Sequence, residues 1–492
     1  MEISKHLFQP AAQKTSRSSA PGAPQRSSLA GAAARFVKNK ASVTAAVIIA
    51  ILLLFALAVP LLSPYTVGFR DGYYRTMPPL FARMVTISGP QAVLDYHSAI
   101  GAEWGDTCVK DLLSREKNED TGRYYYELSA DAYETVGFQY VDIPPAEFEA
   151  LQAYQNATGQ QVCYPIPKNY GTFYLAVSSS ANLWYELSSD SPYSTGQSAH
   201  HNENGDPVFV PNYLHAEPDG SYASLRLEKD PGTWVYGVKN QTGYRCRVLY
   251  SAYYQYKNGF APRHIFGTNQ HGQDILVNLA SGARLSFLLA LGVSAINLLI
   301  GVFYGALEGY YGGRLDLTME RISDILSAIP FIVVATLFQL HLASRVGVVP
   351  SLLFSFVLTG WIGIASRVRS QFYRFKNAEH VLCARTLGAS DKRIIFTHIL
   401  PNAIGTIITS SVLLIPGVIF SESMLSYLGI VNFESNNLTS IGTMLSAGRQ
   451  YLSTYPHILL FPAVFIALLE ISFNLLGNGL RDAFNPALQG AE

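Results

Sequence analysis

The side chains best suited to specific chemistry lie in a polar stretch between two long apolar runs. The stretch, residues 379–401, reads EHVLCARTLGASDKRIIFTHILP. It places four charged side chains close to Gly388: Arg385, Asp391, Lys392 and Arg393. Charged groups collected in this way can contact another protein through charge-assisted hydrogen bonds. Taken on their own, these charges predict a polar face exposed to water.

The elements that must position these charges are two short amphipathic helices at a membrane surface. Apolar side chains recur at roughly helical spacing, at Leu382, Leu387, Ile394 and Ile395. This spacing predicts one apolar stripe that packs inward, while the charged side chains face water.

A tight elbow is predicted between the two helices. Gly388 permits the positive φ of a helix C-cap, and Ala389 keeps the elbow compact. Ser390 or Asp391 can then cap the second helix. Pro401 begins the apolar helix that follows, where its missing N–H costs little.

Several other kinds of site are unsupported. The sequence has no G-x-x-x-x-G-K-[ST] loop for nucleotide phosphates, no C-x-x-C pair and no Ser-His-Asp arrangement that can be assigned to one site. We therefore expect no catalytic residues and no cofactor on this chain. The formal net charge of zero gives no reason to expect nucleic acid as a partner.

Two weaker candidates lie between residues 65 and 262. Residues 200–206 and His215 contain histidines and carboxylates, but their spacing fits a polar loop better than a metal site. Cys108, Cys163 and Cys246 could form one disulfide and leave one thiol, and the sequence leaves the pairing open.

The chain divides into regions of contrasting composition. Residues 1–34 read as a disordered tail. Residues 35–64 begin with Arg35, Lys38 and Lys40 and continue with apolar residues 41–62, long enough to span a hydrocarbon core of about 30 Å. The basic flank predicts a cytoplasmic N-terminus. A cleaved signal peptide is the alternative, but its basic region would be unusually long.

Residues 65–262 hold no run apolar enough to span a membrane and most of the 30 tyrosines. We predict an extracytoplasmic α+β domain. Its expected elements are a helix from Pro145 to Gly159, a second helix after residues 89–90, and a hairpin over residues 234–238 and 246–256. Tyrosines could form a peptide-binding surface here, or simply the core.

Residues 263–492 carry the remaining predicted spans, which are residues 285–305, 332–342, 349–365, 403–420 and 458–476. Gly301 and Gly305 allow close helix packing, and Pro416 predicts a kink. Residues 310–314 predict a cytoplasmic turn. The charged residues near the start of the third span, including Glu320, are expected to be either solvated or ion-paired inside the bundle.

The polar stretch resembles the cytoplasmic loop of ABC-importer permeases, whose pattern is E-A-A-x-x-x-G and, later, x-L-P. Residues that match are Glu379, Ala384, Gly388, Leu400 and Pro401. The peptide-importer branch is the most similar, with His380 in place of its usual tyrosine and Cys383 in place of the first alanine.

Other segments resemble the same family. Residues 35–64 resemble the first helix of the C-type subunit, and residues 264–287 resemble its segment before the second helix, with Asn269 for aspartate and Gln273 for arginine. Residues 421–429 and 477–482 resemble its E-S-x-L-S-F-L-G and G-D-G-L-R-D motifs. The resemblance covers residues 35–64 and 262–490 and leaves out the predicted insert.

The resemblance implies an all-α polytopic membrane protein with six transmembrane helices of the type I ABC-importer permease fold. It implies the C-type permease subunit of a dipeptide or oligopeptide importer in a bacterial or archaeal cell (inner) membrane, with both termini cytoplasmic. Implied partners are a homologous second permease, one or two P-loop ATPases that bind ATP and Mg, an extracytoplasmic substrate-binding protein and the lipid bilayer.

In that family the loop 379–401 is the helix that docks on the ATPase. Two alternatives stay open. One is an importer of the same fold for nickel chelates or oligosaccharides. The other is an anchored surface receptor or adhesion protein without transport.

Overall fold

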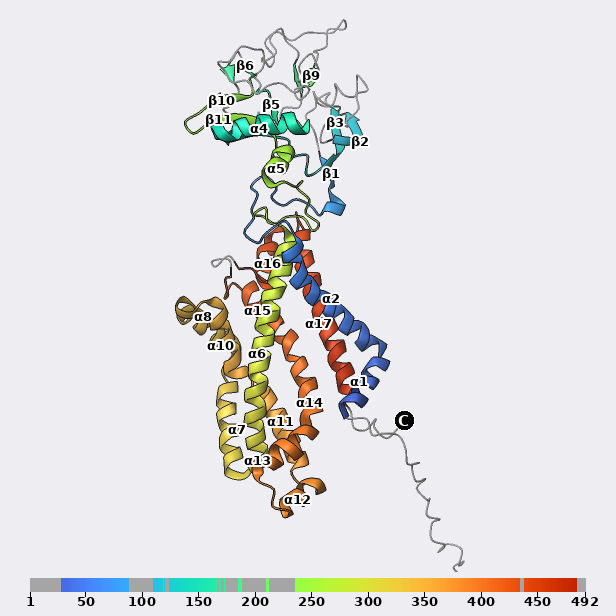
Figure 1. The fold of residues 1–492 in the computed structure, drawn as a ribbon, viewed down its shortest axis with the longest axis vertical. Coiled ribbons are helices and arrows are strands. Elements are labelled where there is room, and N and C mark those ends of the chain that lie inside the picture. Colours follow the sequence, from blue (N-terminus) through green and yellow to red (C-terminus); the bar gives the residue numbers. More distant parts are fainter. Residues whose placement is uncertain are drawn as a thin grey trace, which may run out of the picture.

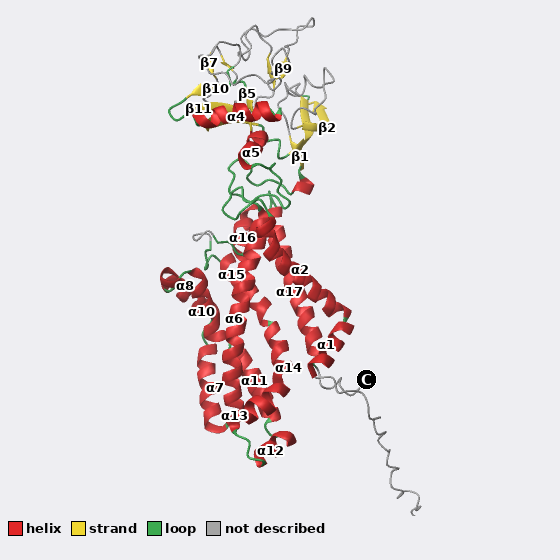
Figure 2. Cartoon of the chain, in the orientation of Figure 1, coloured by secondary structure: helices red, strands yellow, loops and turns green. Residues whose placement is uncertain are grey.

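The chain is elongated, with a helical bundle at one end and strands gathered beyond the other end (Figures 1 and 2). This computed structural model describes residues 28–87, 109–117, 119, 124–166, 168–169, 172–173, 185–187, 209–211, 235–433 and 438–484. The predicted helix after residue 89, the segment 200–206, His215 and Cys108 lie outside the described residues.

The bundle is built from helices that come from both ends of the chain. They are α1 (Ser28–Lys38), α2 (Lys40–Leu62), α6 (Ile275–Tyr311), α7 (Gly313–Ser327), α8 (Phe331–His341), α9 (Ala343–Val346), α10 (Val348–Gly360), α11 (Ile362–Phe375), α12 (Glu379–Thr386), α13 (Asp391–Arg393), α14 (Leu400–Val412), α15 (Leu414–Tyr427), α16 (Ile441–Gly448) and α17 (His457–Ala483). A buried apolar cluster of α2, α6, α15 and α17 side chains forms the main core.

Five helical segments in the described residues are long and apolar enough to cross a membrane: 40–62, 275–311, 348–375, 391–427 and 457–483. The pair α7 and α8 adds a sixth only if it is taken as one span bent by 71°. The prediction of residues 332–342 as a span of its own is therefore wrong. Helix α8 has 11 residues, against about 20 for a transmembrane helix.

The predicted disordered tail is wrong at its end, because α1 already begins at Ser28. Arg35 donates two hydrogen bonds to the Ala483 carbonyl at the end of α17, from Nε at 3.0 Å and from Nη2 at 2.7 Å. A cation at a helix C-terminus is favoured by the helix dipole. This contact joins α1 to the last residue of α17.

Helix α6 packs closely on α11 through its glycines, as predicted. A Cβ added at Gly301 would come within 2.7 Å of the Ile364 Cβ, and one added at Gly305 would overlap the Ala365 carbonyl oxygen. Small residues let two helix backbones approach in this way. The predicted turn is also present, with Gly312 and Gly313 at φ +69° and +62° between α6 and α7.

The predicted fifth span is longer than expected, because it is helical from residue 391 to residue 427. A break at Leu413 separates α14 from α15. Pro416 lies in the first turn of α15 and removes one backbone hydrogen bond there. The kink at Pro416 stays a prediction, because this stretch is otherwise one continuous helical span.

Strands and two helices make up the described part of residues 84–258. They are β1 (Met84–Ile87), β2 (Val109–Lys117), β3 (Tyr124–Asp131), β4 (Phe138–Ile143), α4 (Pro145–Thr158), β5 (Cys163–Tyr164), β6 (Lys168–Asn169), β7 (Thr172–Phe173), β8 (Tyr185–Leu187), β9 (Phe209–Pro211), β10 (Gly237–Lys239), β11 (Tyr244–Leu249) and α5 (Tyr250–Asn258). The two larger sheets are antiparallel, in the orders β1-β3-β2 and β10-β11-β4, and β5 also pairs with β11.

The predicted helix from Pro145 to Gly159 is confirmed, with Gly159 as its left-handed C-cap at φ +66°. The predicted hairpin is confirmed for β10 and β11, but its second strand ends at Leu249 and is followed by α5. Tyr253 and Tyr254 of α5 are buried. Tyr250, Tyr253 and Tyr254 are spaced i, i+3 and i+4, which is the spacing of one helix face, so the strand prediction overlooked a helical signal in the sequence.

An aromatic cluster joins this region to the bundle. Tyr65, Tyr74, Tyr133 and Tyr254 pack together with Val277 near the start of α6. The Tyr133 hydroxyl donates to the Pro78 carbonyl at 2.9 Å. Burial raises the pKa of Tyr74 and Tyr133 above the ordinary value, so both hydroxyls stay neutral even in alkaline solution.

Candidate functional site

Helices α12 and α13 lie at the end of the bundle farthest from the strands (Figure 1). Val381 and Ala384 of α12 are buried, whereas Leu382 is 44% exposed and Leu387 is 82% exposed. The predicted inward stripe is therefore wrong in α12. Val381 and Ala384 lie three residues apart and share the face that packs on the bundle, and Leu387 follows the last turn and points away.

The elbow after α12 has the predicted geometry. Gly388 has φ +79°. Its N–H donates to the Arg385 carbonyl and the Ala389 N–H donates to the Ala384 carbonyl, both at 3.0 Å. A Cβ at Gly388 would meet nothing within 4 Å. Glycine is thus needed here for the backbone conformation, and the outer surface of the elbow is open.

Helix α13 leads directly into the bundle. It is followed by a π-helical turn, Ile394–Ile399, and then by α14 without interruption. Ile394, Ile395 and Ile399 are buried against α6, α11 and Val381 of α12, as predicted for Ile394 and Ile395. Ser390 occupies the N-cap position, but its side chain makes no capping hydrogen bond. The elbow is therefore built on the first turn of a long bundle helix.

Tyr310, in the last turn of α6, ties the elbow to that helix. Its hydroxyl donates to the Asp391 carboxylate at 2.6 Å. The Arg385 guanidinium lies 5.9 Å from the centre of the Tyr310 ring, within reach of a cation–π interaction. Sequence reasoning missed this role, because residues 310–314 were interpreted only as a turn. The structure thus brings Arg385 and Asp391 to one aromatic ring.

A second polar cluster lies nearby and centres on Arg369 of α11. The Arg369 guanidinium contacts Asp316 of α7 at 2.6 and 2.9 Å and Glu320 of α7 at 3.0 Å. Glu308 of α6 lies 3.7 Å from the Arg369 Nε. One partly buried cation therefore links three helices, which is the ion-paired alternative predicted for Glu320. Arg321 and Asp324, by contrast, form an exposed pair at 3.2 Å.

The remaining predicted site residues are not brought together. Glu379, Lys392, Arg393 and Pro401 are exposed. Glu379, Lys392 and Arg393 have no ion-pair partner among the described residues. Within the same part of the chain no group of three or more His, Cys, Asp or Glu side chains could hold a metal ion. The elbow is thus a surface with fixed backbone and unpaired charges, which suits it to binding another protein.

Comparison with known proteins places this geometry in a family. Residues 297–490 match the model described as "Binding-protein-dependent transport system inner membrane component", and residues 27–79 match "N-terminal TM domain of oligopeptide transport permease C". The oligopeptide transport system permease protein OppC of Bacillus subtilis (strain 168) is 43% identical over 226 residues, which are 46% of this chain and 72% of OppC. This chain belongs to the family of oligopeptide and dipeptide transport permeases.

Two further matches accompany this one. The dipeptide transport system permease protein DppC of the same B. subtilis strain is 39% identical over 227 residues, covering 46% of this permease and 69% of DppC. A solved inward-facing structure of the MetNI methionine ABC transporter covers 42% of this chain and 96% of its own, with 17% identity and a TM-score of 0.35. That structural likeness is too low to inform the fold.

Membership of the family defines the general role of this chain. As a multi-pass permease of an ABC importer, it is a transport component, and ATP hydrolysis takes place on separate ATPase subunits. The match to the N-terminal model ends at residue 79, and the match to the second model begins at residue 297. The whole strand-containing region, residues 84–258, therefore lies outside both matches.

Proposed function

We propose that this permease is the C-type subunit of an ABC importer for peptides and is coupled to a cytoplasmic ATPase through residues 379–401. The observation that carries the coupling role is the elbow at Gly388. Its backbone is fixed in a left-handed conformation, nothing covers its outer surface, and the helix that starts there runs through the bundle. Peptide cargo is supported by the printed names of the relatives.

The complete importer would contain a homologous second permease, one or two P-loop ATPases and an extracytoplasmic substrate-binding protein. In this arrangement each permease forms half of the translocation path, and both lie in the lipid bilayer. ATP and Mg bind to the ATPases, since this sequence has no phosphate-binding loop. ATP binding changes the conformation of the permease because the ATP-bound ATPase favours one of the two permease arrangements.

The proposed orientation puts the elbow and both termini in the cytoplasm of a bacterial or archaeal cell and residues 65–262 outside the cell (inner) membrane. Cys383 supplies a direct test, because its thiol is exposed on α12. A membrane-impermeant maleimide should modify Cys383 only after the membrane is permeabilised, as read by mass spectrometry of the labelled peptide. Modification of Cys383 in intact cells would reverse the orientation.

We divide the chain into a tail of residues 1–34, a first span in 35–64, an insert of 65–262 and a permease core of 263–492. The insert would dock the binding protein or cover the pore mouth, since the strands lie beyond the end of the bundle opposite α12 (Figure 1). Removing residues 88–234 should then change the uptake rate without preventing assembly. An unchanged uptake rate and substrate affinity would remove this role.

The names of the relatives favour peptides over nickel chelates or oligosaccharides, and family membership disfavours a receptor or adhesion protein without transport. The deciding experiment is purification of the complex in mild detergent with mass spectrometry and an ATPase assay, followed by uptake of labelled di- to pentapeptides in proteoliposomes. A second permease, P-loop ATPases and ATP-dependent peptide uptake would support the proposal. Purification of this chain alone, without ATPase activity, would contradict it.

A further inference from the structure

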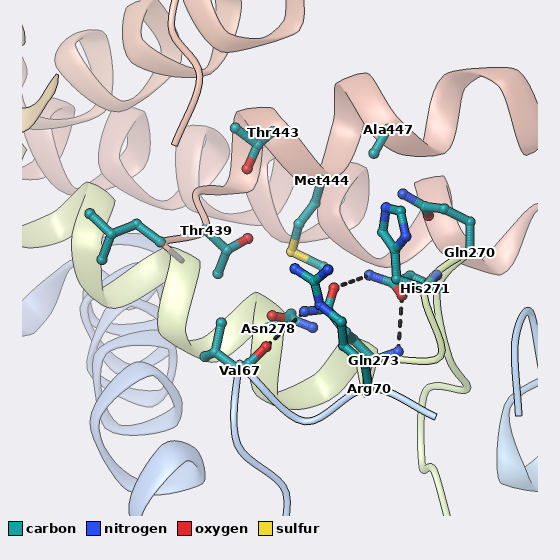
Figure 3. Close-up of a pocket in the computed structure, with 12 residues that line it drawn as sticks. Val67, Arg70, Gln270, His271, Gln273, Asn278, Thr439, Thr443, Met444 and Ala447 are labelled. Atoms are coloured by element: carbon teal, nitrogen blue, oxygen red, sulfur yellow. Dashed lines mark hydrogen bonds between the residues drawn. The ribbon is translucent and has the colours of Figure 1, made fainter. Parts of the chain in front are cut away.

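A polar hollow lies at the outer end of the bundle, between the segment before α6 and the start of α16 (Figure 3). Its lining comprises Val67, Arg70, Asn269, Gln270, His271, Gln273, Asn278, Leu438, Thr439, Thr443, Met444 and Ala447. A second hollow of about 360 Å³ adjoins it and shares Gln270, His271, Thr443 and Ala447. That volume falls in the range of small-ligand sites, about 300–1,000 Å³.

The segment that carries Arg70 is fixed to the loop before α6. The Asp71 N–H donates to the Gly272 carbonyl at 3.3 Å, and the Thr76 N–H donates to the Asn269 carbonyl at 3.0 Å. A Cβ at Gly272, which has φ +71°, would overlap the Asp71 carbonyl oxygen. This close approach determines where Arg70 lies, and Figure 3 shows its side chain extending across the hollow toward Met444.

No described residue compensates the charge of Arg70. Neither hollow has an acidic residue in its lining, and no carboxylate of the described residues forms an ion pair with Arg70. The neighbouring Asp71 is engaged elsewhere, because its carboxylate accepts hydrogen bonds from the Tyr73 N–H at 2.8 Å and from the Tyr250 hydroxyl at 2.8 Å. The hollow therefore presents a single positive charge.

The other polar side chains near Arg70 form the wall of the hollow. Gln273 donates to the Val67 carbonyl at 2.7 Å and accepts from the Asn269 side chain at 2.9 Å. Both side chains therefore stabilise the loop before α6. The Gln270 Oε1, by contrast, is buried and accepts no hydrogen bond from the described residues. This oxygen has almost no accessible surface, so Gln270 contributes to the wall of the hollow and not to ligand contact. Gln270 lines both hollows.

We propose that these two hollows form a carboxylate-anchored binding site for the C-terminal end of a short peptide. The Arg70 guanidinium binds the terminal carboxylate, and the preceding residues lie in the second, uncharged hollow beside Gln450 and Tyr451. Arginine suits this role because its planar donors match a carboxylate. The inference rests on the proposed peptide transport and adds how the outer mouth recognises the cargo.

The test compares one peptide with a free C-terminal carboxylate and the same peptide with a C-terminal amide, in the fully reconstituted importer. Uptake kcat/KM is measured for the wild type, Arg70→Gln and Arg70→Lys. Arg75→Gln is the matched control, since Arg75 is an exposed arginine of the same segment that lines neither hollow. The affinity of the isolated binding protein for each peptide is measured separately. The ratio of uptake kcat/KM for the two peptides is then divided by the ratio of these affinities.

We expect the wild type to prefer the free carboxylate by about three- to tenfold, as one charge-assisted hydrogen bond at a partly exposed site provides. Arg70→Gln should reduce this ratio to about one, Arg70→Lys should retain part of it, and Arg75→Gln should leave it unchanged. A ratio that survives Arg70→Gln overturns the site. Equal loss for both peptides overturns it as well and assigns Arg70 to contact with the binding protein. Absence of any peptide uptake by the wild type would instead refute the proposed function.

Discussion

Replacing Gly388 by glutamate should abolish uptake without unfolding the permease. Gly388 has φ +79° and a Cβ there would meet no atom within 4 Å. A side chain at this position therefore strains the backbone but clashes with nothing in the chain. The strain is about 1–2 kcal/mol for an ordinary residue and less for asparagine, which changes a conformational equilibrium by roughly 5- to 30-fold.

These magnitudes separate the strain from the effect on binding. Gly388→Ala and Gly388→Glu carry the same backbone strain, so both should lower the melting temperature equally, and Gly388→Asn should lower it less. Only Gly388→Glu adds bulk and negative charge on the open surface of the elbow. We expect Gly388→Ala to retain reduced uptake and ATPase binding, whereas Gly388→Glu loses both.

The measurements are thermal unfolding of the purified chain in detergent, the amount of ATPase that co-purifies, and peptide uptake in proteoliposomes. Equal uptake by the alanine and glutamate variants would show that the elbow surface contacts no ATPase. A much lower melting temperature for glutamate than for alanine would refute the conclusion that this surface is uncovered within the chain.

Three further perturbations follow from the packing. Arg369→Gln leaves Asp316, Glu320 and Glu308 without their cation and should cost about 3–5 kcal/mol of stability. The double variant Arg369→Gln with Asp316→Asn should recover part of this loss. If thermal unfolding shows that the two losses simply add, the pairing is contradicted. In Gly305→Leu the new side chain overlaps the Ala365 backbone, so this variant should lower the melting temperature. The control is Gly363→Leu, which should lower it less because a Cβ there meets nothing within 4 Å. Equal effects of the two variants would contradict the close approach of α6 and α11. Cys163 and Cys246 are buried free thiols on neighbouring strands, and a hydrogen bond to Cys163, together with burial, raises the pKa of the Cys246 thiol. The thiolate is the reactive form, so iodoacetamide should alkylate both thiols much more slowly in the folded protein than in urea, and equal rates by peptide mass spectrometry would contradict this.

Features encoded by neighbouring residues could be predicted from the sequence. The first span, the turn at Gly312 and Gly313, the Pro145 helix start and the positive φ of Gly388 depend on local chemistry of glycine, proline and apolar runs. The bend between α7 and α8 was missed because an apolar run says how long a span can be but not how the chain bends within it.

Which face of a short helix is buried depends on the rest of the fold. In α12 the large Leu382 and Leu387 are exposed and the smaller Val381 and Ala384 are buried, so side-chain size alone gives the wrong stripe. The polar pairs were equally out of reach. Tyr310 and Asp391 are 81 residues apart and Arg369 and Asp316 are 53 apart, and no local pattern connects residues at such separations.

The last turn of α6 makes the elbow inseparable from the other bundle helices. Glu308 approaches Arg369 of α11, and a Cβ at Gly309 would come within 2.6 Å of the Phe372 Cβ, also on α11. Tyr310 in the same turn binds Asp391 of the elbow. A single hydrogen bond to a charged group contributes only about 1.5–3 kcal/mol, which is too little to move a packed helix. The continuous helix from α13 into α14 must therefore transmit most of any displacement, while the Tyr310–Asp391 contact sets the position of the elbow relative to α6.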